Sequence, residues 1–207
     1  MARWTLYTAP GTCALASHIA LREAGADFDL VRLDFGAAQQ RSAGYLAINP
    51  KGRVPALATD EGVLTETPAI LAFIAQRHPD ARLAPASEDF AYARMQEFNS
   101  FLASTVHVAH AHKRRGARWV DDPAAIEAMR AKVPQSMTAC AELIEARLAG
   151  PWLLGERYSV ADGYLYTISG WLEGDGVDLA RFPRIVDHHR RVGGRPAVRR
   201  AVEESGA

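Results

Sequence analysis

The chain has 207 residues, of which 48% are hydrophobic and 23% charged, as is usual for a globular protein of one large or two smaller domains. Its 24 basic and 24 acidic residues balance, which argues against nucleic acid or an anionic membrane as a partner. No apolar run resembles a membrane span or a signal peptide, and the two cysteines give no disulfide framework. We therefore expect a cytoplasmic protein.

The first part of the chain alternates between strand and helix patterns. Short runs of β-forming residues are separated by apolar residues at helical spacing, and Gly or Pro stands near each boundary. The predicted elements are a strand at 4–8, a helix at 13–24, a strand at 28–33, a short helix within 36–49, a hairpin at 54–65 and a helix from Glu66. This order, βαβαββα, predicts an α/β domain over residues 1–79.

A proline-containing linker at 80–86 precedes a region in which strand signals nearly vanish. Pro134 is expected to kink or split one of the helices there, and Ser159 and Asp162 have the spacing of a capping box. Residues 87–207 are therefore predicted to form an all-α domain, with helices at 87–118, 122–148, 159–174, 182–193 and 196–204.

Cys13 is predicted to lie in the first turn of a helix, after a Pro-Gly turn and with Thr12 as a possible N-cap. The positive end of a helix favours a thiolate and lowers the pKa of the thiol, so this cysteine is a candidate reactive group. A small buried residue is the alternative, because free cysteines are among the most buried residues. Cys140 follows an apolar helical stripe and is expected in the core.

Four segments, in their order and separations, carry a resemblance that covers essentially the whole chain. They are Pro-Gly-Thr-Cys-Ala-Leu-Ala at 10–16, Asn-Pro-Lys-Gly-Arg-Val-Pro-Ala-Leu at 49–57, Thr-Glu-Thr-Pro-Ala-Ile-Leu at 65–71 and Ser-Val-Ala-Asp-Gly-Tyr-Leu at 159–165. Together they resemble the cytosolic glutathione transferases, most closely the bacterial beta class. The resemblance implies a thioredoxin-like glutathione-binding domain, an all-α domain that forms the acceptor site, and a homodimer.

The resemblance also implies how glutathione is bound. Val54-Pro55 matches the family's cis-proline bond, which exposes the main chain of Val54 to pair with the cysteinyl unit of glutathione. Glu66 and Thr67 stand at a helix start that can hold the α-carboxylate and ammonium of the γ-glutamyl unit. Threonine replaces the serine that the family more often has at position 67.

Two contacts to glutathione are less well specified by the resemblance. The lysine that the family tends to place after the second strand is missing, so Gln39, Gln40 and Arg53 are the nearest polar candidates for the glycine carboxylate. Ser100 stands where the family has an asparagine thought to reach glutathione from the partner subunit. Its shorter side chain leaves that contact open.

His107 matches the family histidine that faces the thiol site, where it would stabilise the glutathione thiolate or act as a general base. Cys13 would donate to that thiolate or form a mixed disulfide with glutathione. We expect His110, Tyr164 and Trp171 to form walls of the acceptor site. No metal is expected, since His112 lies off the face shared by the other two histidines and no acidic or cysteine partner is near.

The predicted function is conjugation of glutathione, as co-substrate, to small hydrophobic electrophiles. One alternative is thiol-disulfide exchange or reductive dehalogenation through Cys13, using a second glutathione because no resolving cysteine is near. Another is a non-catalytic regulator on the same fold. Its docking face would be an arginine-rich C-terminal surface consisting of Arg190, Arg191, Arg195, Arg199 and Arg200.

Overall fold

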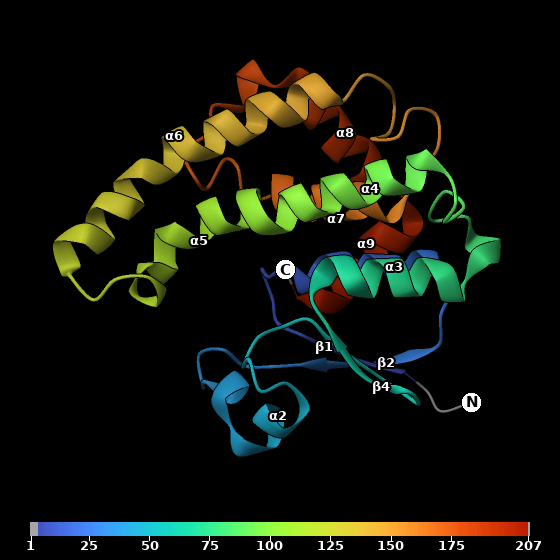
Figure 1. Ribbon diagram of the computed structural model, residues 1–207, viewed down its shortest axis with the longest axis horizontal. Coiled ribbons are helices and arrows are strands. Elements are labelled where there is room, and N and C mark those ends of the chain that lie inside the picture. The colour runs from blue at the N-terminus through green and yellow to red at the C-terminus, as the bar shows by residue number, and fades with distance from the viewer. Residues whose placement is uncertain (1–3, 207) are drawn as a thin grey trace.

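The computed structural model describes residues 4–206 and consists of an α/β part packed beneath a layer of helices (Figure 1). A four-stranded sheet contains β1 (Trp4–Thr8), β2 (Phe28–Arg32), β3 (Ala56–Thr59) and β4 (Gly62–Thr65) in the order β2-β1-β3-β4. β1 pairs with β2 in parallel, whereas β3 is antiparallel to both β1 and β4. The predicted hairpin is confirmed, although its first strand begins at Ala56 instead of residue 54 because Val54-Pro55 lies outside the ladder.

Three helices accompany the sheet, namely α1 (Ala14–Glu23), the short α2 (Ala43–Ile48) and α3 (Thr67–Arg77), so the predicted order βαβαββα is confirmed. α1 is the central helix of the molecule, since it packs against β1 and α3 on one side and α7 and α9 on the other. Small residues allow this close approach: Ala14, Ala16 and Ala20 are at most 2% exposed. The N-terminus of α1 therefore lies at the boundary between the two parts.

The predicted helix at 87–118 is a continuous helical stretch whose hydrogen-bonding pattern changes along its length. α4 (Phe90–Phe101) leads into a π-helical turn (Leu102–Val106), followed by α5 (His107–Arg115) and a 3-10 turn (Gly116–Arg118). It begins at Phe90, later than predicted. A π-helical turn inside a longer helix often accompanies a functional site, and here it directly precedes His107.

α6 (Pro123–Arg147) runs without a break through Pro134, so a split helix is the wrong prediction. The ring of Pro134 fits against Gly176, where an added Cβ would lie only 3.1 Å from the proline Cγ. The absence of a side chain at Gly176 lets the ring pack closely against this turn. Cys140 lies on the inner face of α6 and is 6% exposed, which confirms its predicted place in the core.

The remaining helices are α7 (Val160–Ser169), α8 (Pro183–Gly193) and α9 (Pro196–Ser205). α7 ends well before residue 174, the predicted boundary, because turns around Gly170 and Gly176 replace further helix. The apolar pattern misled the prediction since Trp171 and Leu172 pack against the core without being helical. Within residues 4–206, no helix combines the length and apolar character that crossing a membrane requires.

The predicted capping box of α7 is confirmed and forms part of a larger buried network. Ser159 caps the helix, and the fully buried Asp162 carboxylate accepts from the backbone N–H groups of Ser159 and Leu153, each at 2.8 Å. The Nε2 atom of His188, on α8, lies 2.9 Å from the same carboxylate. One side chain thus joins the start of α7 to the preceding loop and to α8.

Replacing Asp162 by Ala should lower the free energy of unfolding by ~3 kcal/mol, because it leaves two buried N–H groups and His188 without their acceptor. Ser159→Ala, which removes the cap and one hydroxyl hydrogen bond to Asp162 but leaves the two N–H groups their acceptor, should cost ~1 kcal/mol. Urea unfolding followed by circular dichroism measures both. Equal losses for the two variants would show that the network adds nothing to the cap.

Candidate active site

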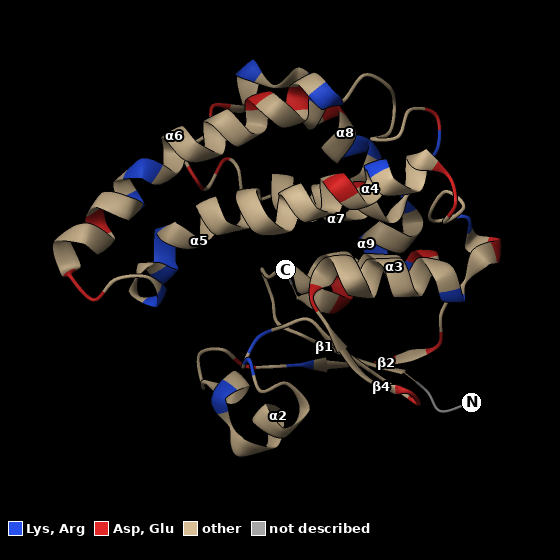
Figure 2. Cartoon of the chain, in the orientation of Figure 1, with Lys and Arg blue, Asp and Glu red and all other residues tan. Residues whose placement is uncertain are grey.

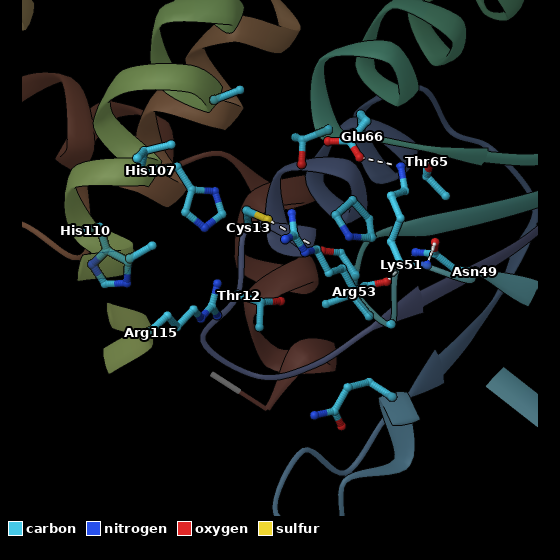
Figure 3. Close-up of a pocket in the computed structure, with 18 of the residues that line it drawn as sticks. Thr12, Cys13, Asn49, Lys51, Arg53, Thr65, Glu66, His107, His110 and Arg115 are labelled. Carbon is cyan, nitrogen blue, oxygen red and sulfur yellow. Dashed lines mark hydrogen bonds and ion pairs between the residues drawn. The ribbon is translucent and has the colours of Figure 1, made fainter. Parts of the chain in front are cut away.

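A pocket of about 310 Å³ opens at the N-terminus of α1, between the α/β part and α5 (Figure 3). Its floor comes from the turn after β1, the segment before β3 and the start of α3, and its opposite wall comes from α5, α7 and the turn after α7. The predicted residues that line it are Cys13, Arg53, Val54, Pro55, Glu66, Thr67, His107, His110, Tyr164 and Trp171. Most of the predicted site is therefore brought together by the fold.

Cys13 is the N-cap residue of α1, and its side chain is directed into the pocket (Figure 3). The residue is only 7% exposed, and its Sγ donates to the backbone oxygen of Val54 at 3.7 Å. Burial raises the pKa of the Cys13 thiol, and this effect outweighs the opposing influence of the Thr67 side chain and the positive charge of Arg115. The predicted lowering of the pKa by the helix end is therefore wrong, because desolvation dominates.

Thr12 is not the N-cap that the sequence suggested. Its hydroxyl instead donates to the backbone oxygen of Ala9 at 2.7 Å and closes the turn that contains Gly11. Gly11 has a φ of +68°, a conformation that glycine adopts without the steric cost of a side chain. This turn brings the chain from the end of β1 directly to the pocket.

The Val54-Pro55 bond is cis, as the resemblance implied. The preceding residue is held firmly, since the backbone oxygen of Arg53 accepts from the Tyr45 hydroxyl and from Asn49 Nδ2, each at 2.6 Å. Sequence reasoning missed both anchoring residues, although Asn49 begins one of the segments that resemble the family. Their effect is to fix the backbone of Val54 at the pocket edge.

The start of α3 has an unusual backbone that aims its first residues into the pocket. Glu66 has a φ of +71°, a conformation that costs a non-glycine residue roughly 1–3 kcal/mol and persists mainly at functional sites. Its carboxylate is paired with Lys51, whose Nζ also donates to the Thr65 hydroxyl at 2.6 Å (Figure 3). Thr67, the first residue of α3, is buried beside Cys13 and Tyr164.

His107 begins α5 and directs its ring toward Cys13 across the pocket (Figure 3). Burial, reinforced by the positive charges of Arg115 and other nearby cations, lowers the pKa of His107 to about 4. The neutral imidazole is therefore the favoured form at neutral pH. A neutral imidazole can accept a hydrogen bond from a thiol or donate one to a thiolate.

His110 lines the pocket, and its ring is held by Asp175, a residue that does not line it. Its Nδ1 lies 2.6 Å from a carboxylate oxygen of Asp175, a residue that is 3% exposed, and its ring stacks on Trp171 with centroids 4.3 Å apart. Lys113 Nζ lies 3.1 Å from the other oxygen of Asp175. Across residues 4–206, no three His, Cys, Asp or Glu side chains are grouped closely enough to hold a metal ion.

Tyr164 is 1% exposed and lines the pocket, and burial raises the pKa of its hydroxyl, so the hydroxyl stays protonated.

Ser100 does not line the pocket of its own chain but is exposed on α4. Gln39 also lies outside, where its Oε1 accepts from the backbone N–H of Asp34, whereas Gln40 reaches the pocket with a buried Oε1 that has no hydrogen-bond partner in residues 4–206.

Sequence reasoning missed most of the positive charge at this site. Arg41, Arg115 and Arg118 line the pocket together with Lys51 and Arg53, and Figure 2 shows basic residues both at the end of α5 and around α2. Arg115 is partly buried and Arg118 is exposed, and both line the pocket. The local sequence pattern of a helix does not show which distant part of the chain its last turn will contact.

The low pKa of His107 leads to a direct spectroscopic prediction. The imidazole should stay neutral through pH 5 and titrate near pH 4, because both burial and nearby cations oppose its protonation. Chemical shifts of the ring, followed by NMR as a function of pH and assigned by loss of the signal in His107→Gln, measure this. A midpoint at or above the ordinary value of 6.5 contradicts the electrostatic description of the pocket.

The Cys13 thiol of the free protein should remain protonated at neutral pH. Its alkylation by iodoacetamide should be slow at pH 7 and should still be rising at the ordinary thiol pKa of 9.0, because burial raises the pKa and only the thiolate reacts. Mass spectrometry of the modified peptide distinguishes Cys13 from Cys140. A rate that is already maximal at pH 7 would mean that the helix end, not desolvation, determines the thiol pKa.

The chain matches known proteins over nearly its whole length. Residues 2–76 match the family model of the glutathione S-transferase N-terminal domain. The chain is 32% identical to the glutathione S-transferase GstA of Escherichia coli O157:H7, over 97% of this chain and 98% of the relative.

Solved structures resemble it closely as well. A glutathione transferase homologue from Sulfitobacter with bound glutathione is 46% identical, covers 100% of this chain and 99% of its own, and superimposes with a TM-score of 0.95. A bacterial beta class enzyme from Sphingomonas chungbukensis is 34% identical over 98% of each chain, with a TM-score of 0.86. The chain thus belongs to the glutathione S-transferase family and is most like its bacterial beta class.

Proposed function

We propose that the protein conjugates the thiolate of glutathione to small hydrophobic electrophiles. The observation that carries this proposal is the convergence, at one pocket, of the Val54 main chain, the start of α3 and a neutral His107 facing Cys13. Relatives with the same fold have been solved with glutathione bound. In this proposal residues 1–79 bind glutathione, residues 80–86 link the two domains, and residues 87–207 provide the acceptor site.

Glutathione would lie along the α/β side of the pocket. Its cysteinyl unit would pair with the main chain of Val54, in the manner of an added strand. The α-carboxylate would meet the N-terminus of α3 at Thr67, and the adjacent ammonium would meet Glu66. Gln40 and Arg41 are suited to the glycine carboxylate, because both line the pocket and the Gln40 amide nitrogen and the Arg41 guanidinium can each donate a hydrogen bond to it.

The reaction needs a glutathione thiolate beside the acceptor. The glutathione thiol releases its proton to solvent water, the sulfur forms a bond to the electrophilic carbon, and the leaving group departs with the electron pair of the bond that breaks. Cys13, as a protonated thiol, and His107 can each donate a hydrogen bond to the anionic sulfur. Fixed donors and positive charges in a partly dehydrated pocket stabilise that anion and hold the two reactants together.

The acceptor would occupy the side of the pocket lined by His110, Tyr164 and Trp171.

We further propose a cytoplasmic homodimer. Ser100, which is exposed on α4, is available to the site of a partner subunit but does not reach the pocket of its own chain.

The alternatives receive less support from the geometry. Exchange or reductive dehalogenation through Cys13 needs its thiolate, whereas burial favours the protonated form.

A docking role for the arginine-rich surface is weakened because several of its members already have intramolecular partners. Arg195 forms two hydrogen bonds to Glu23, Arg191 binds the backbone oxygen of Pro151, and Arg200 pairs with Glu204.

Thr67→Val should weaken glutathione binding about three- to tenfold, because it removes one hydrogen-bonding hydroxyl from the γ-glutamyl site without changing the shape of the side chain. Isothermal titration calorimetry with reduced glutathione measures the affinity. Thr105→Val, at an exposed position outside the pocket, is the matched control and should bind like the unchanged protein. Identical affinities for the two variants would contradict the proposed binding mode.

Turnover separates the proposed function from its alternatives. The protein should conjugate glutathione to 1-chloro-2,4-dinitrobenzene, and Cys13→Ala should retain at least part of this activity because the reacting sulfur belongs to glutathione. Loss of a disulfide-reductase activity in Cys13→Ala, without any conjugation by the unchanged protein, would instead support exchange. Failure to bind glutathione at all would support a non-catalytic protein.

A further inference from the structure

The candidate active site contains more positive charge than glutathione can neutralise. Five cationic side chains line the pocket against one carboxylate, that of Glu66. Lys51 is paired with that carboxylate, which leaves the guanidinium groups of Arg41, Arg53, Arg115 and Arg118. Within residues 4–206, none of these four forms an ion pair.

The four arginines converge from both parts of the fold. Arg41 and Arg53 belong to the α/β part, whereas Arg115 ends α5 and Arg118 ends the following 3-10 turn. Arg115 lies near Thr12 and points into the pocket (Figure 3). Arg53, Arg115 and Arg118 are close enough to His107 to act on its charge. Unpaired cations held this close repel one another, and an anion among them relieves that repulsion.

Glutathione supplies only part of the negative charge needed to balance the four arginines. Bound as proposed, its α-carboxylate and ammonium meet Thr67 and Glu66 and so neutralise each other. The glycine carboxylate and the thiolate remain, which is two negative charges for four guanidinium groups. Two positive charges are therefore left for the other reactant.

The unmatched charge lies beside an aromatic wall. Trp171 carries the stacked ring of His110, and Asp175 holds that ring in place. Trp119, 44% exposed, lines the pocket next to Arg118. We infer that the acceptor is a planar unsaturated or aromatic electrophile that carries a carboxylate or similar anionic group, which Arg115 and Arg118 bind. This inference rests on the proposed function and specifies its substrate class.

The test compares two acceptors of nearly the same shape, 4-chloro-3,5-dinitrobenzoate and the neutral 4-chloro-3,5-dinitrobenzamide. In both, the thiolate sulfur bonds to the carbon that carries chlorine, and chloride leaves with the bonding electron pair. Each kcat/KM is divided by the uncatalysed rate constant with glutathione, which corrects for intrinsic reactivity. The benzoate should be favoured about tenfold at low ionic strength, and the preference should shrink as salt is added.

Variants assign the preference to the arginines at the end of the helix. Arg115→Gln and Arg118→Gln should each reduce the benzoate-to-benzamide ratio severalfold. Arg114→Gln is the matched control, since it makes the same change in net charge on the same helix at an exposed residue outside the pocket, and it should keep the ratio. Measuring the KM for glutathione in every variant separates effects on the two reactants.

Each failure has a distinct signature. Turnover of the benzamide without a benzoate preference overturns the inference while leaving the proposed function intact. So does a rise in the KM for glutathione in Arg115→Gln and Arg118→Gln with equal losses for both acceptors, because the arginines would then serve glutathione alone. Absence of turnover with both acceptors contradicts the proposed function itself, and the inference with it.

Discussion

Desolvation of the Cys13 sulfur is the constraint on which the description of this site depends. α1 is surrounded by β1, α3, α7 and α9, so its N-terminus opens into a pocket inside the molecule and not onto a solvated surface. Burial therefore outweighs the positive helix end, and the thiol is kept protonated. A protonated cysteine is a hydrogen-bond donor. In the proposed reaction the sulfur that becomes anionic would then be that of glutathione, and the Cys13 thiol would donate a hydrogen bond to it.

In the same pocket, negative charge is stabilised by the guanidinium groups of arginine side chains and not by a base that takes up a proton. His107 is neutral at physiological pH because it is buried and surrounded by cations, so it contributes a hydrogen bond and little net charge. The guanidinium groups remain ionised at any relevant pH. Charges that are already in place need no reorganisation during the reaction, which is how a preorganised site favours a developing or entering anion. In the proposal, the same residues would stabilise the glutathione thiolate and bind an anionic acceptor.

The sequence predicted the order of elements and most of the pocket because these depend on local signals. Alternation, the Gly and Pro residues near element boundaries and the family-like segments pointed to Cys13, Val54, Thr67 and His107, which line one pocket. Quantities that depend on packing could not be predicted in this way. The thiol pKa depends on what covers α1. The place of the arginines in the pocket depends on where the last turn of α5 meets the α/β part.

Ultraviolet difference absorbance of the thiolate as a function of pH, in the complex with glutathione, tests the division of roles between the two sulfurs. It is measured on Cys13→Ala beside the unchanged protein. In both, one thiolate should appear with a midpoint at least one pH unit below that of free glutathione, since the anion belongs to the ligand in the field of the arginines. A thiolate signal that disappears in Cys13→Ala, or one that titrates as in free glutathione, would contradict the account.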